Sequence, residues 1–93
     1  METFVGNTVK LILETGIDLT GYTTLRVRYI KPDKTYGSWI AALSPTDNTW
    51  LEYTTLITDL NIPGTWVVQA HVTDIGQALH GKWADFMVYT PIP

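Results

Sequence analysis

The sequence predicts an all-β domain built as a sandwich of two antiparallel sheets, on three observations. Apolar and polar residues alternate with a period of two along several short segments, and clusters of turn-forming residues separate those segments. No apolar pattern at helical spacing is longer than one turn. The 93 residues, 45% hydrophobic and 16% charged, suffice for one core but not for two, so a single domain over residues 1–93 is expected.

The first half of the chain shows two clear alternating segments. One face of each is apolar: Val9, Leu11 and Leu13 in the first, then Leu25, Val27 and Tyr29 in the second. Between them, residues 15–21 form a glycine-containing connection whose Ile17 and Leu19 are expected to close one end of the core.

Turn chemistry then marks two hairpins. Pro32 within residues 31–34 presets the backbone for a turn, and residues 44–48 are a run of turn formers. The apolar run 38–43 before the second turn and the alternating segment 49–55 after it are predicted strands.

The clearest strand covers residues 66–72, with Trp66, Val68, Ala70 and Val72 on one face. Residues 74–81 are predicted to form a longer loop, and residues 83–89 a last strand before the two C-terminal prolines. The ends, residues 1–7 and 90–93, are expected to be flexible and free to reach neighbouring molecules.

About seven short strands, with turn signals roughly every 8 to 12 residues, are typical of an immunoglobulin-like antiparallel β-sandwich. The structural alternative is an OB-like or other small barrel.

Charge and composition exclude several partners. The formal net charge is −3 and the only basic stretch is residues 26–34, so no nucleic acid is expected as a partner. The N-terminus has no signal-peptide pattern and no stretch is apolar for long enough to cross a bilayer, so no membrane is expected either. The absence of cysteine excludes disulfides and thiolate metal ligands.

No candidate for catalysis has the required spacing. Ser38 and Ser44, the only serines, lack a nucleophile-elbow context, and His71 and His80 have too few companions to bind zinc. The aspartates at connections lack the spacing of a calcium loop, and scattered carboxylates and histidines are the sole argument for a small hydrolase. The prediction is a protein that is not an enzyme, with no catalytic residue, metal or cofactor.

The tryptophans are the candidate contact residues. Trp66 is predicted to lie in the core, whereas Trp39, Trp50 and Trp83 are expected to face outward and to contact partner proteins, together with Arg26 and Arg28. Exposed aromatic rings also stack on sugars, so a carbohydrate- or host-surface-binding domain is the alternative.

Three segments carry a family resemblance: residues 18–21 (Asp-Leu-Thr-Gly), residues 25–33, and residues 60–70 with their Pro-Gly-Thr-Trp corner. They resemble small immunoglobulin-like domains of tailed-phage virion proteins, most closely the N-terminal domain of phage upper baseplate proteins. Lys34 stands where that family usually has glycine.

The resemblance implies a non-enzymatic structural component of the virion that decorates a capsid or joins neck, tail or baseplate subunits. Its partners would be other virion proteins, with symmetric self-association as the default. No catalytic residue is carried over from the family.

Overall fold

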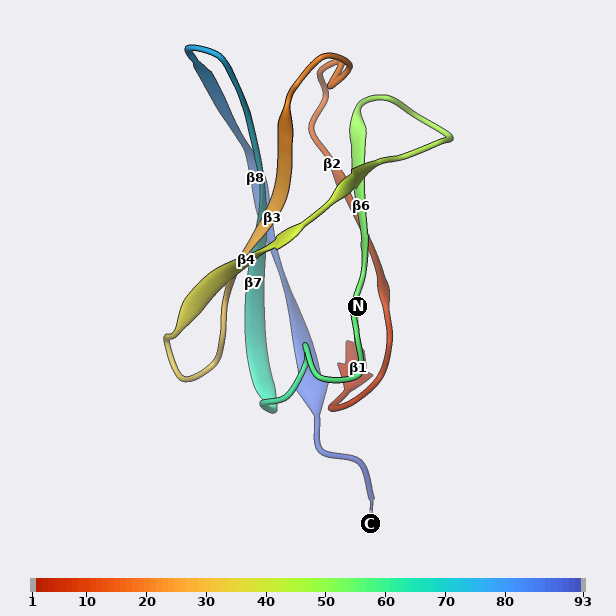
Figure 1. Cartoon of the computed structure of the whole chain (residues 1–93). Coiled ribbons are helices and arrows are strands. Elements are labelled where there is room, and N and C mark those ends of the chain that lie inside the picture. Colours follow the sequence, from red (N-terminus) through yellow and green to blue (C-terminus); the bar gives the residue numbers. More distant parts are fainter. Residues whose placement is uncertain (1, 93) are drawn as a thin grey trace.

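Two β-sheets packed face to face make up the protein (Figure 1), and the computed structural model describes residues 2–92. All regular structure in this range is strand. The strands are β1 (Glu2–Phe4), β2 (Lys10–Glu14), β3 (Thr24–Ile30), β4 (Tyr36–Ile40), β5 (Ala42–Leu43), β6 (Trp50–Thr54), β7 (Gly64–Asp74) and β8 (Gln77–Tyr89). The predicted all-β sandwich is confirmed, and no helix in the described range could cross a membrane.

One sheet has five strands in the order β1-β8-β7-β3-β4, and the other has three in the order β2-β6-β5. Apart from β1, this is the order of strands G, F, C and C′ in one sheet and B, E and D in the other of immunoglobulin variable domains. The sheets are not purely antiparallel, because β1 pairs in parallel with β8, Glu2 lying opposite Met87 and Phe4 opposite Tyr89. The two open sheets do not form the closed barrel that was the alternative.

The inward side chains of both sheets form one core. Trp66, Val27 and Leu51 are fully buried, and Leu11 and Leu13 bury the face of β2 that alternation predicts. A stack of rings fills the centre, with Trp39 at 4.9 Å from Tyr53 and 6.2 Å from Trp66 between ring centroids. Aromatic pairs at such distances add to the stabilisation from buried area.

The hairpin predicted at residues 31–34 is present and joins β3 to β4. The Lys34 amide donates to the Lys31 carbonyl at 2.9 Å, and Lys31 N–H donates to the Thr35 carbonyl at 2.7 Å. Lys34 has a φ of 74°, in the left-handed region that favours glycine. The turn therefore forms with lysine in a position where glycine is the unstrained residue.

The corner between β6 and β7 is fixed by the ring of Trp66. Its indole Nε1 donates to the Ile62 carbonyl at 2.9 Å, as a tyrosine at the start of strand F does in many immunoglobulin domains. Gly64 has a φ of +128°, and a Cβ there would lie 2.7 Å from Cβ of Pro32. Only glycine fits where β7 begins.

The prediction of a longer loop over residues 74–81 is wrong. β7 and β8 form a continuous hairpin joined by Ile75 and Gly76, and Gly76 has a φ of 73°. A positive φ at the second central residue of a turn favours glycine, so a two-residue turn at Ile75 and Gly76 replaces the expected loop.

Two further predictions need correction. The run 38–43 is not one strand, because the Ala41 amide bonds the Leu25 carbonyl and the chain then crosses to the other sheet as β5. The N-terminal segment is not free, since β1 and Val5, whose amide donates to the Tyr89 carbonyl at 2.9 Å, are bound to β8. Met1 and Pro93 lie outside the described residues.

Candidate binding surface

The outward side chains of β8, β7, β3 and β4 form the candidate site, here called the outer face. Cross-strand pairing aligns them in rows. One row consists of Trp83, Gln69, Arg28 and Ser38, and the next of Asp85, Val67, Ile30 and Tyr36. Successive residues of a strand point to opposite sides, so the packing of Val27 and Val68 inward fixes these rows outward.

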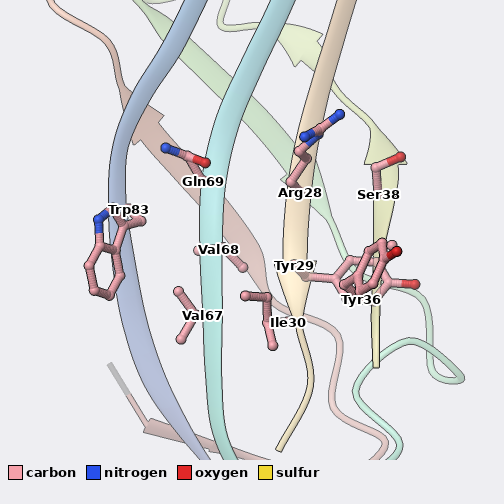
Figure 2. Close-up of a pocket in the computed structure, with 10 residues that line it drawn as sticks. Arg28, Tyr29, Ile30, Tyr36, Ser38, Val67, Val68, Gln69 and Trp83 are labelled. Atoms are coloured by element: carbon pink, nitrogen blue, oxygen red, sulfur yellow. The ribbon is translucent and has the colours of Figure 1, made fainter. Parts of the chain in front are cut away.

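A groove of about 660 Å³ runs across the outer face (Figure 2). Trp83 lies at its β8 end and Tyr36 at its β4 end, and they are 69% and 84% exposed. Ile30, 46% exposed, and Val67 form the apolar floor between them. Exposed aromatic and aliphatic side chains are thus gathered on one face and are not scattered singly over the surface.

A β-bulge positions Trp83. Two steps along β7, from Gln69 to His71, match three along β8, from Trp83 to His80, so β8 carries one extra residue. The Gln69 amide Nε2 donates to the Gly81 carbonyl at 3.0 Å, which fixes the bulge beside the tryptophan.

The two arginines of β3 differ in their partners. Arg26 donates from Nη1 to Oγ of Ser38 at 3.1 Å. Arg28 is exposed, and no residue in the range 2–92 accepts a hydrogen bond from it or forms an ion pair with it. Its guanidinium is therefore available to a carboxylate or a carbonyl of a partner.

His71 lies at one end of this face with its ring centroid 4.5 Å from that of His80. Burial lowers the pKa of His71, and the positive charges of Arg28, His80 and Arg26 lower it further. Its buried Nδ1 has no hydrogen-bond partner among the described residues. The face thus disfavours protonation of His71 and carries positive charge on its arginines.

The predicted contact residues are only partly brought together. Trp83, Arg26 and Arg28 share the outer face, whereas Trp50 is half-buried on β6 in the other sheet. The expectation that Trp39 faces outward is wrong, since it is 8% exposed and stacks on Tyr53 in the core.

Sequence reasoning missed Tyr36, Ile30 and Gln69. Ile30 has the same parity as Arg26 and Arg28 on one strand, so alternation alone places it on their face. The positions of Tyr36 and Gln69 depend on which strands are neighbours, which the sequence pattern does not give.

The outer face shows neither a serine–histidine pair nor a metal-binding cluster among residues 2–92. Ser38 Oγ accepts a hydrogen bond from Arg26, and neither histidine is hydrogen-bonded to a serine within residues 2–92. No group of three or more His, Asp or Glu side chains in the same range is placed to hold a metal ion. The groove offers ring stacking, apolar contact and a free guanidinium.

No protein-family model matches this chain, and no curated protein matches it in sequence.

Proposed function

We propose that this protein is a non-enzymatic structural component of a tailed-phage virion, an immunoglobulin-like module that docks on a neighbouring virion protein through its outer face. Capsid decoration and the joining of neck, tail or baseplate subunits are both compatible with such a module.

One observation carries the docking role: β8, β3 and β4 present Trp83, Ile30 and Tyr36 on one groove beside Arg28, which has no partner within residues 2–92. Protein interfaces are enriched in aromatic residues and arginine, and a few such residues supply most of the binding energy. A face composed in this way fits a protein partner that has apolar groups and a carboxylate.

The virion assignment is supported by the segments that carry the family resemblance, since each of them includes part of a connection of the sandwich. Oδ1 of Asp18 accepts from the Thr20 amide at 2.9 Å in the first connection, and Oδ1 of Asp33 accepts from the Thr35 amide at 3.0 Å in the second. Trp66 closes the corner after Pro63. The resemblance therefore rests on residues that determine the shape of the domain.

Mass spectrometry of purified virions from the source phage tests the proposal. The chain should be present at a fixed ratio to a structural protein across particle density fractions. Its absence from intact particles would refute the virion role.

A carbohydrate-binding role is the second candidate, favoured by Trp83 and Tyr36 with Gln69 and Arg28 between them. Aromatic rings stack on sugar faces while amide and guanidinium groups bind hydroxyls. Trp66 and Trp39 are buried and Trp50 is half-buried in the other sheet, so a change in tryptophan fluorescence on glycan titration at this groove would report mainly on Trp83. A signal lost in Trp83→Phe would favour this role, and no response over a broad glycan panel would exclude it.

A further inference from the structure

The strand β2 lies at an open edge of its sheet. It is the first strand of the three-stranded sheet and, within residues 2–92, pairs only with β6. Backbone hydrogen bonds just beyond both ends of β2 show which of its residues bond β6. The Thr55 amide donates to the Val9 carbonyl at 2.8 Å, and the Thr15 amide donates to the Thr49 carbonyl at 2.9 Å. Since hydrogen-bonded pairs alternate along an antiparallel ladder, the odd-numbered residues of β2 bond β6.

The backbone N–H and C=O groups of Lys10, Ile12 and Glu14 therefore point away from β6, toward the open edge. Such a row is a template for one more strand. Ile12 is 48% exposed, so this edge presents an apolar side chain between two charged ones.

The sandwich is also open beside β2. A cleft of about 230 Å³ lies between Leu11 and Leu13 of β2 and Ala84 and Phe86 of β8. Among the described residues, β1 pairs only with residues 87–89 of β8, and none of them pairs with the adjoining part of that strand on this side. An added strand beside β2 has room there.

We propose that the added strand is β2 of a second copy, paired antiparallel about a twofold axis at Ile12. In this register Ile12 faces Ile12 of the partner subunit, and Lys10 faces Glu14 of the partner subunit. Three strands from each copy then form one continuous six-stranded sheet. A twofold axis makes both charge pairs equivalent.

Two properties of the segment Lys-Leu-Ile-Leu-Glu select this register. Every free backbone group of one copy meets a free group of the other, because the facing residues are all even-numbered. A shift of the register by two residues places Lys10 or Glu14 opposite Ile12 of the partner subunit, so both charge pairs are lost. A shift by four residues places Lys10 opposite Lys10 or Glu14 opposite Glu14 of the partner subunit, and like charges repel. Charged side chains usually prevent an edge strand from pairing with another chain. Here Lys10 and Glu14 disfavour every register except the one centred on Ile12.

Charge reversal tests the register by sedimentation velocity at protein concentrations up to about 1 mM. The wild-type chain should dimerise. Either Glu14→Lys or Lys10→Glu alone creates two pairs of like charges in each dimer, one on each side of the twofold axis. This repulsion should raise the dimer Kd about tenfold. An equimolar mixture of the two variants should dimerise again, since each Lys then meets a Glu. Glu14→Lys is the cleaner single change, because Lys10 also pairs with Glu52 at 3.1 Å within one chain.

Matched variants on two edges identify the strand. Ile12→Lys should abolish the dimer, whereas Ile40→Lys on β4, at another exposed edge strand, should leave it intact. Near-ultraviolet circular dichroism confirms that each variant is folded. A wild-type chain that stays monomeric, a dimer insensitive to Glu14→Lys, or one dissociated by Ile40→Lys would each overturn the proposal. The inference does not depend on what the outer face binds.

Discussion

The hydroxyl of Tyr53 donates a hydrogen bond of 2.6 Å to Oδ2 of Asp59, and the Leu56 amide donates to the same oxygen at 2.7 Å. This carboxylate thereby joins the end of β6 to the connection that leads into β7. Burial, then the hydrogen bond and charge of Asp59, raise the pKa of Tyr53 to about 12. The contact holds the corner against which Trp39 and Trp66 pack.

Removal of that hydroxyl should destabilise the fold. Tyr53→Phe is expected to lower the free energy of unfolding by about 1 to 2 kcal/mol, because it removes a hydrogen bond to a charged, partly buried acceptor. Urea unfolding followed by circular dichroism measures this. Tyr36→Phe, at an exposed ring, is the control and should change little. Equal effects of the two substitutions would contradict the role of the contact.

Acid should destabilise the protein through His71. Its pKa is lowered in the folded state by burial and by Arg28, His80 and Arg26, so the unfolded chain binds a proton first. The stability that neutral His71 contributes is fully present above its unfolded pKa of about 6.5 and is lost as pH falls through the lowered folded pKa.

The measurement compares urea midpoints of the wild-type protein and His71→Gln between about pH 7 and pH 5. The wild type should lose more stability over this interval. Hydrogen bonds from Thr20, Thr35 and Thr49 lower the pKa of Asp18, Asp33 and Asp47 respectively, so their contributions are lost only below about pH 4. Identical pH dependence in both proteins would refute the assignment to His71.

Replacing Lys34 by glycine should stabilise the turn between β3 and β4. Lys34→Gly relieves the cost of a φ of 74° and increases the freedom of the unfolded chain, with an expected net gain of about 0.5 to 1 kcal/mol. Lys34→Ala removes the same charge but keeps the strain, so it should give no gain. Thermal unfolding of the three proteins separates the two effects, and a gain with alanine as large as that with glycine would contradict backbone strain as the cause.

Trp66 and Trp83 should differ sharply in their effect on stability. Trp66→Phe leaves a cavity in the core and removes the bond to Ile62, at an expected cost of about 2 to 4 kcal/mol. Trp83→Phe, on the exposed face, should stay within about 0.5 kcal/mol. Comparable losses in chemical denaturation would mean that the outer face is part of the folding core.

Local physics made most of this fold predictable. Alternation placed Leu11, Leu13, Val68 and Val72 correctly in the core, and Pro32 marked a hairpin that forms. Ile17 was expected in the core beside Leu19, yet it is 36% exposed. The prediction failed because a connection has no regular alternation from which the direction of each side chain could be read.

The remaining features depend on contacts that are distant in sequence. The segment around Trp39 alternates too weakly to show which side faces the core, and its inward position follows from pairing with Val27. Gly76 was recognised as a turn residue, but residues 77–82 lack the large apolar alternation that predicts a strand. The sequence predicted part of the outer face, since Arg26, Arg28 and Trp83 lie on it. Tyr36 and Gln69 were missed because their place beside these residues depends on which strands are neighbours in the sheet.

Docking through the outer face is tested most directly by competitive incorporation into particles. Wild-type chain and Trp83→Glu are supplied in equal amounts during phage assembly, and their ratio in purified virions is measured by mass spectrometry. Ile75→Glu, at the exposed hairpin between β7 and β8, is the matched control. We expect Trp83→Glu to be depleted at least about tenfold while Ile75→Glu is incorporated like the wild type. Incorporation of Trp83→Glu at parity with the wild-type chain would contradict the account.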